Sequence, residues 1–253
     1  MNLTIDIGNT RTKMVVFDGA TPVHEEILTG HLQEAIRKLA QHYPLKQCAW
    51  CSVCGNDEEQ GAMLSDLGFP VRQLTGTSEV PLTVCYQSPQ TLGADRLAAV
   101  LGATALCPQS DLLVIDAGTC ITYDLADAKG HYLGGNISPG IEMRLKALHH
   151  YTARLPLVEA AGNLPAMGID TETAIRCGVI EGVRFEIEGY VTRLRTIYPQ
   201  LQIFLTGGGR FHLPEQMLQH FRYDPHLVSR GLNRILGTCL LYTSDAADDG
   251  ESV

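Results

Sequence analysis

Two short stretches of this sequence combine an aspartate, a glycine and hydroxyl residues at the end of an apolar strand pattern. The first turn reads Asp6-Ile7-Gly8-Asn9-Thr10-Arg11-Thr12-Lys13, and the second turn reads Asp116-Ala117-Gly118-Thr119. Glycine lets a backbone approach a ligand closely, and successive N–H groups in a tight turn form a concave surface that binds anions. Asn9 and Thr10 add polar side chains, and Lys13 adds a charge that suits a β- or γ-phosphate. The pattern predicts two phosphate-binding turns.

The aspartate that begins each turn has a chemical use of its own. The carboxylates of Asp6 and Asp116 are suited to hold a cation, or a water bound to a metal ion, beside phosphate groups. For one copy alone, an ordinary type I′ hairpin turn with a polar tip is an open alternative. The second copy favours phosphate binding, because a pair of facing turns requires the internal duplication that this sequence contains.

A third stretch, Gly93-Ala94-Asp95-Arg96, lies where a loop gives way to an alanine-rich helix pattern. At that position Asp95 is able to act as a general base that takes the proton of an attacking hydroxyl. Arg96 is able to hold a substrate carboxylate through a forked pair of hydrogen bonds. An aspartate at a helix N-terminus also serves as a simple cap, so both interpretations of Asp95 stay open here.

Two glycine-rich stretches suggest further parts of a ligand site. Thr206-Gly207-Gly208-Gly209 follows an apolar strand pattern, and its glycines cost backbone entropy that a plain turn does not require. Close approach of an adenine or a ribose to the backbone explains them, and a loose loop is the alternative. Residues 134–140 resemble the constrained wall of a cleft.

Three cysteines, Cys48, Cys51 and Cys54, are spaced as metal ligands often are. Strand alternation would place Cys48 and Cys54 on one face and Cys51 on the other, so the three thiols would not converge on one ion. The sequence therefore predicts a buried strand in which reduced thiols act as small apolar groups.

Composition excludes several classes of protein. The 253 residues are 45 % hydrophobic and 19 % charged, as in a globular protein, and no apolar run approaches the ~20 residues that span a bilayer. The start lacks the pattern of a signal peptide, so we expect a cytoplasmic protein without a membrane partner. A formal net charge of −9 opposes a nucleic-acid surface, so we expect no nucleic-acid partner.

Around these motifs, the same order of elements occurs twice. Hairpins over residues 3–18 and 112–125 each precede helices, which we expect at 31–42, 58–67 and 96–106 in the first half and at 141–151, 171–195, 214–220 and 231–241 in the second. We expect two α/β domains, over residues 1–110 and 111–241. Residues 242–253 lack apolar periodicity, so we expect a disordered or non-native tail.

Taken together, these stretches resemble the type III pantothenate kinases, a branch of the acetate and sugar kinase/actin superfamily. The resemblance covers about residues 1–241. It rests on the stretches above and on the spacing Thr171-x-x-Ala174-Ile175-x-x-Gly178. It implies two duplicated ribonuclease H-like (actin-like ATPase) domains, each with a mixed central sheet, and a cleft between them.

The resemblance also implies an activity and roles for individual residues. The enzyme would phosphorylate the primary hydroxyl of pantothenate from ATP, the first step toward coenzyme A, with Asp95 as catalytic base. By the same resemblance, the first turn and Thr119 contact ATP, whereas residues 93–96, Tyr86 and Thr171 contact pantothenate. Asp116 helps to bind a monovalent cation (K+ or NH4+), magnesium (Mg2+) accompanies the nucleotide, and the protein is a homodimer.

Two other functions stay open at this point. One is a sugar or acetate-type kinase on the same scaffold. The other is a regulatory or ligand-sensing protein without catalysis, because some relatives of the family have been described as accessory factors for transcription.

Overall fold

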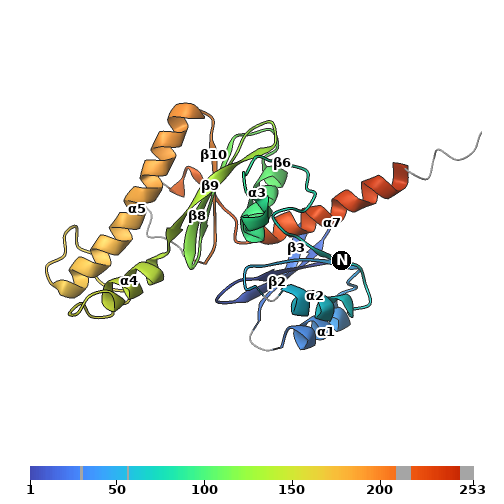
Figure 1. The fold of residues 1–253 in the computed structure, drawn as a ribbon, viewed down its shortest axis with the longest axis horizontal. Helices are drawn as coiled ribbons and strands as arrows, with labels where there is room; N and C mark the ends of the chain where they lie inside the picture. Colours follow the sequence, from blue (N-terminus) through green and yellow to red (C-terminus); the bar gives the residue numbers. More distant parts are fainter. Residues whose placement is uncertain (29–30, 56, 209–217, 246–253) are drawn as a thin grey trace, which may run out of the picture. The chain divides into compact units, whose positions relative to one another are not determined.

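The computed structural model describes residues 1–28, 31–55, 57–208 and 218–245, and it divides into two compact units (Figure 1). Unit 1 contains Met1–Gln109, Ala126–Gly134 and the chain from His226 onward. Unit 2 contains Ser110–Leu125 and Gly135–Pro225. The domain limits expected from the sequence stay a prediction, because compact units and duplicated domains are different properties of a chain.

Unit 1 is built on a five-stranded mixed sheet in the order β3-β2-β1-β4-β5. Strand β1 pairs with β2 in antiparallel fashion and with β4 in parallel fashion. The strands are β1 (Asn2–Ile7), β2 (Thr12–Asp18), β3 (Thr21–Ile27), β4 (Gln47–Ser52) and β5 (Val71–Gln73). Because β1 and β4 run in parallel, the residues that follow both strands meet at one edge of the sheet.

One face of this sheet is covered by α1 (Leu32–His42) and α2 (Asp57–Ser65). The apolar positions of α1 recur at helical spacing, so Ala35, Ile36 and Leu39 all reach the core around the buried Trp50. Alternate residues of β1 point to this core and away from it. Leu3, Ile5 and Ile7 belong to the core, so Asp6 lies on the opposite face.

That opposite face carries α3 (Ala94–Leu106) and α7 (Leu227–Asp245). On this face Asn2 donates a side-chain hydrogen bond to Asn233 of α7 at 2.8 Å. The two helices pack very closely, because a Cβ at Gly231 would lie 1.8 Å from the carbonyl oxygen of Ala98. The start of α3, which carries Asp95, is thereby held on the side of the sheet to which Asp6 belongs.

A second mixed sheet has six strands in the order β11-β10-β7-β8-β9-β6, and the division between the units passes through β8 and β9. Its strands are β6 (Thr83–Val84), β7 (Leu112–Ala117), β8 (Cys120–Ala126), β9 (His131–Pro139), β10 (Gln202–Thr206) and β11 (Phe221–Tyr223). Unit 2 also contains α4 (Ile141–His150) and α5 (Thr171–Ile197), and α5 packs Val183 and Ile187 into the core of this sheet.

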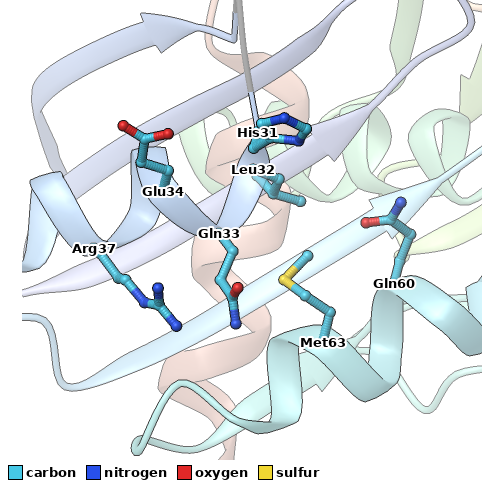
Figure 2. Close-up of a pocket in the computed structure, with 7 residues that line it drawn as sticks. All are labelled: His31, Leu32, Gln33, Glu34, Arg37, Gln60 and Met63. Atoms are coloured by element: carbon cyan, nitrogen blue, oxygen red, sulfur yellow. The ribbon is translucent and has the colours of Figure 1, made fainter.

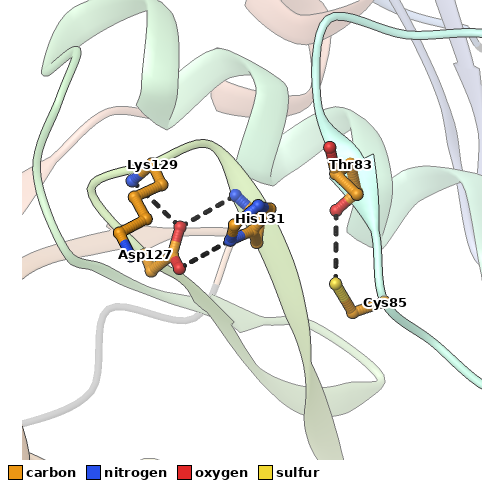
Figure 3. A network of polar contacts seen from close by, with 5 residues as sticks. All are labelled: Thr83, Cys85, Asp127, Lys129 and His131. Carbon is orange, nitrogen blue, oxygen red and sulfur yellow. Dashed lines mark hydrogen bonds and ion pairs between the residues drawn. The ribbon is translucent and has the colours of Figure 1, made fainter.

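The turn between β8 and β9 is fixed by Asp127 (Figure 3). Its carboxylate accepts hydrogen bonds from the backbone N–H groups of Lys129 and His131 at 3.0 and 2.9 Å, and Oδ2 lies 2.8 Å from Nδ1 of His131. The start of β9 pairs with β6, and the N–H of Cys85 donates to the carbonyl of Tyr132. This pairing fixes the strand that leads directly into Tyr86.

The structure confirms both hairpins and most of the helices expected from the sequence. It adds the short 3-10 helix η1 (Pro89–Thr91), together with the strands β6, β9 and β11, which the sequence analysis did not predict. Of the helix expected at 214–220, residues 214–217 lie outside the described residues. Helix α7 begins four residues earlier than expected and continues to Asp245, and residues 246–253 lie outside the description.

Across the described part of the chain, no helix is both long enough and apolar enough to cross a membrane.

Candidate functional site

The first turn closes the β1–β2 hairpin of unit 1. The N–H of Gly8 donates to the carbonyl of Arg11 at 3.1 Å, and a Cβ at Gly8 would lie only 3.1 Å from that same oxygen. Asn9, Thr10 and Arg11 are exposed, so the tip of the turn presents polar groups to solvent. Ile7 and Thr12 form the last strand pair beneath the tip. The hairpin thus offers a rigid polar tip, as the phosphate hypothesis requires.

Lys13 lies beside the turn and forms an ion pair with Glu25 of β3, with Nζ 3.1 Å from Oε1. Nδ1 of His226 lies 3.2 Å from the other oxygen of Glu25. The positive charge of Lys13 is therefore already shared with a carboxylate. Any phosphate at this turn has to compete with Glu25 for it.

Asp6 is partly buried at the end of β1, and its pKa is raised to about 6. Burial is the largest cause, and the negative charge of Asp95 is the second. A hydrogen bond from the thiol of Cys51, at 3.7 Å, and the charges of Lys13 and Arg11 act in the opposite direction without cancelling the rise. The electrostatic coupling indicates that the carboxylates of Asp6 and Asp95 lie near one another in unit 1.

Asp95 lies in the first turn of α3, and the cap position before that helix is Gly93, which has no side chain. Oδ1 of Asp95 accepts a hydrogen bond from the N–H of Arg96 at 2.8 Å. A Cβ at residue 93 would lie 2.6 Å from the same oxygen, so glycine leaves this carboxylate space. Asp95 is thus not the N-cap residue, although it occupies the favourable N-terminal end of the helix.

Arg96 and Tyr86 come together in unit 1. The guanidinium carbon of Arg96 lies 5.8 Å from the centre of the Tyr86 ring, within the range of a cation–π contact. Tyr86 also packs against Tyr132, with 6.1 Å between the ring centres. Arg96 and Tyr86, which both have an expected role in substrate binding, are therefore in contact. Arg96 directly follows Asp95 in the sequence.

The second turn follows β7 in unit 2, and two glycines press against it. Gly140 donates its N–H to the carbonyl of Thr119 at 3.0 Å, and a Cβ at Gly140 would lie 2.5 Å from the oxygen of Gly118. Gly207 has a φ of +92°, and a Cβ there would lie 2.6 Å from Oδ1 of Asp116. Close backbone packing is therefore one reason for glycine at positions 140 and 207, in the two glycine-rich stretches singled out in the sequence.

Gly209 lies outside the described residues, and a role of residues 206–208 at an adenine stays a prediction.

Thr171 is the first residue of α5, whose start is fixed by a capping box between Asp170 and Thr173. It is exposed and lines an open hollow of about 580 Å³ together with Arg154, Pro156, Asp170 and Glu172. Thr171, Thr119 and Asp116 belong to unit 2, whereas the other predicted site residues belong to unit 1. That the two groups face one another across a cleft stays a prediction.

Another open hollow, also of about 580 Å³, lies between α1 and α2 in unit 1 (Figure 2). It is lined by His31, Leu32, Gln33, Glu34, Arg37, Gln60 and Met63. None of the residues predicted to bind a ligand lines it, and a catalytic site at the first turn and Asp95 stays a prediction.

Two cysteines at the first turn were not predicted as neighbours of the site. Cys51 is buried and hydrogen-bonded to Asp6, whereas Cys54 lies beyond β4, is exposed, and has its Sγ 3.3 Å from the carbonyl oxygen of Gly8. The expectation of a buried strand through Cys54 was wrong, because β4 ends at Ser52. Because Ser52 is the parallel partner of Ile7, the residues after β4 meet the first turn, and this register is not visible in the sequence.

Comparison with solved structures shows the fold. The chain resembles a proposed transcriptional activator of the Baf family from Campylobacter jejuni, with a TM-score of 0.63 and 24 % identity over 94 % of this chain and 99 % of that one. It also resembles component A of (R)-2-hydroxyglutaryl-CoA dehydratase from Acidaminococcus fermentans, with a TM-score of 0.53 and 14 % identity over 92 % and 95 % of the two chains. The fold is α/β, of the ribonuclease H-like kind that actin-like ATPases and sugar kinases share.

Sequence comparison defines the family. The family model for type III pantothenate kinase matches residues 2–193. A type III pantothenate kinase from Phocaeicola vulgatus is 48 % identical over 93 % of this chain and 98 % of its own length, and one from Porphyromonas gingivalis is 40 % identical over 93 % and 97 %. The chain belongs to the type III pantothenate kinases. It is therefore a phosphotransferase with an alcohol acceptor, and it uses ATP.

Proposed function

We propose that this protein transfers the γ-phosphoryl group of ATP to the primary hydroxyl of pantothenate, the first step of coenzyme A biosynthesis. The observation that carries the proposal is membership of the type III pantothenate kinases, and the site within this chain is supported by the electrostatic coupling of Asp6 with Asp95. This coupling brings a carboxylate suited to proton abstraction to the base of a polar, glycine-containing hairpin. That combination serves phosphoryl transfer, which depends on positioning and charge neutralisation.

In this proposal the two turns bind the triphosphate. Residues 6–13 supply backbone N–H groups and the exposed side chains of the tip, and Thr119 supplies a hydroxyl from the second turn. Lys13 leaves Glu25 for a phosphate oxygen when the nucleotide binds, because a charge-assisted hydrogen bond to phosphate replaces the one to the carboxylate.

Asp95 takes the proton of the pantothenate hydroxyl while the hydroxyl oxygen attacks the γ-phosphorus atom and ADP leaves. The helix N-terminus and the N–H of Arg96 stabilise the ionised carboxylate before the reaction. Burial is the main cause of the raised pKa of Asp6, and repulsion by the negative charge of Asp95 adds to it. The proton acquired by Asp95 relieves part of that repulsion as the transfer proceeds.

The pantothenate site consists of Tyr86, Thr171 and residues 93–96. Arg96 binds the carboxylate of pantothenate and Tyr86 orients its guanidinium, since the two side chains are already in contact. The exposed Thr171, at the rim of a hollow, adds a hydroxyl to the site.

Two cations complete the proposal. Magnesium (Mg2+) binds mainly through phosphate oxygens and water and offsets the charge of the triphosphate. A monovalent cation (K+ or NH4+) binds at Asp116. The residues fit such a hard ion, because a Cβ at Gly207 would fill the space beside two oxygens, 2.6 Å from Asp116 Oδ1 and 2.4 Å from the carbonyl of Ala117. We propose further that the enzyme is a cytoplasmic homodimer.

The test is the variant Asp95→Asn, which keeps the shape of the side chain and removes the base. We expect a folded protein whose turnover with ATP and pantothenate falls ~10²-fold or more, measured by coupled ADP release. Asp66→Asn changes an exposed aspartate of the same unit and is the matched control, with unchanged turnover. Near-normal turnover in a well-folded Asp95→Asn protein would exclude Asp95 as the base.

A further inference from the structure

A cluster of polar side chains in unit 2 has no part in the function proposed above. Arg144 of α4 and Glu186 of α5 form an ion pair whose side chains are each only 22 % exposed. Tyr123 of β8 donates to Oε1 of Glu186 at 2.9 Å, and Nη2 of Arg144 donates to Oγ of Ser138 at 2.7 Å. The cluster therefore joins two helices and two strands around one pair of opposite charges.

Arg144 leads from this cluster to the second turn. Its Nε donates to the carbonyl of Pro139 at 2.7 Å, so one guanidinium holds both residues that precede Gly140. The backbone of Gly140 in turn donates to the carbonyl of Thr119. Because a Cβ at Gly140 would lie 2.5 and 2.6 Å from the carbonyl oxygens of Gly118 and Thr119, the two backbone segments are packed without free space between them. A shift of residues 138–140 must move the second turn.

Glu186 fixes the orientation of the guanidinium. Burial alone would raise the pKa of Glu186, but hydrogen bonds from Arg144, Ser138 and Tyr123 outweigh that effect and lower the pKa. Glu186 therefore stays ionised at neutral pH and retains its hold on Arg144. Tyr123 is itself held by packing against Tyr190, with 4.2 Å between ring centres. Tyr123, which holds Glu186 in place, is thus part of the core of unit 2.

We propose that Arg144 and Glu186 are positioning residues for ATP: they fix residues 138–140, and through them the phosphate-binding turn at Thr119. The proposal rests on the function proposed above for Thr119. We therefore expect the ion pair to affect the binding and use of ATP and not those of pantothenate.

The first test is Glu186→Gln, which keeps the size of the side chain and removes its charge. Loss of one charge-assisted hydrogen bond at a positioning residue should lower kcat/KM for ATP about tenfold. At saturating ATP, kcat/KM for pantothenate should change less than twofold. Glu188→Gln is the matched control, because it removes an ion pair with Arg184 on the same helix and should leave both values unchanged.

A second test uses Arg144→Lys, which keeps the charge. Lysine has one nitrogen in place of the three of the guanidinium, so it cannot reach Pro139, Ser138 and Glu186 together. The variant should reproduce the loss for ATP. Combined with Glu186→Gln it should add little, since both changes release the same segment. Equal losses for ATP and pantothenate, or a lowered melting temperature with unchanged kinetics for ATP, would reduce the ion pair to a general structural role and overturn the proposal.

A failure of the proposed function would be recognised by a different result. If the unaltered protein turns over no pantothenate, calorimetric binding of ADP still tests the positioning role. Glu186→Gln should then weaken ADP binding about tenfold relative to Glu188→Gln. Equal ADP affinities in the two variants would refute the positioning role independently of the substrate.

Discussion

Asp6→Asn should make unit 1 more stable at neutral pH while it impairs nucleotide binding. The pKa of Asp6 rises from 3.8 to about 6 on folding, so between these values the folded state keeps a proton that the unfolded state has released. The free energy of unfolding therefore falls as pH rises through this window. The difference in pKa corresponds to about 3 kcal/mol, fully developed above about pH 7.

Asparagine is isosteric with aspartate and still accepts the hydrogen bond from Cys51, so the variant removes chiefly the partly buried charge. The stability of Asp6→Asn relative to the unaltered protein should increase by about 3 kcal/mol from about pH 4 to about pH 7. Trp50 is the single tryptophan and is buried in the core of unit 1, so urea unfolding followed by its fluorescence reports on this unit.

Asp18→Asn, at the exposed far end of the same hairpin, is the control and should show no such change with pH. A stability difference for Asp6→Asn that stays flat with pH, or one that Asp18→Asn reproduces, would refute the reasoning. A flat difference would mean that Asp6 is solvated in the folded protein, and the same change in Asp18→Asn would mean that the effect is not specific to Asp6.

Two further predictions concern Arg96 and the helix pair α3–α7. Arg96→Ala should raise KM for pantothenate ~10- to 100-fold with little change in KM for ATP, as expected for the loss of a charge-assisted hydrogen bond; an unchanged KM for pantothenate in steady-state kinetics would place the carboxylate elsewhere. Gly231→Ala should destabilise the protein by about 3 kcal/mol or more, because its Cβ would overlap the carbonyl of Ala98. Gly237→Ala on the same helix meets no atom within 4 Å and should instead stabilise it by about 1 kcal/mol in thermal unfolding; similar effects of both variants would contradict the packing argument.

Much of the fold was predictable because its strands and helices have regular apolar periods. The amphipathic α1 and the two hairpins were recognised in this way. Strand β9 was not, because its residues 134–139 are rich in glycine and carry the proline and polar residues of a loop. Its pairing with β6 is made by backbone hydrogen bonds, from Thr83 to Gly130 and from Cys85 to Tyr132, which leave no apolar period in the sequence.

The candidate site was predictable where chemistry is local and unpredictable where it depends on neighbours distant in the sequence. The first turn and Asp95 stood out by residue type, but their coupling follows from the position of Asp6 on the face that carries α3 and α7. The ion pair of Lys13 with Glu25 depends on the β2–β3 register, and that of Arg144 with Glu186 joins two helices. No spacing rule finds such pairs, because each depends on how elements pack.

The balance of charge around the two turns explains why a kinase of this design should depend on cations. In unit 1, Lys13 is paired with Glu25, and Asp95 adds to the raised pKa of Asp6, so the exposed Arg11 supplies most of the positive charge that the first turn offers to a triphosphate. The second turn contains no lysine or arginine, so in the proposed function it binds phosphate through backbone and hydroxyl groups alone. Neutral donors orient a phosphate well but do not cancel its charge. In the proposed function, the cations that accompany the nucleotide or bind at Asp116 supply the remaining positive charge.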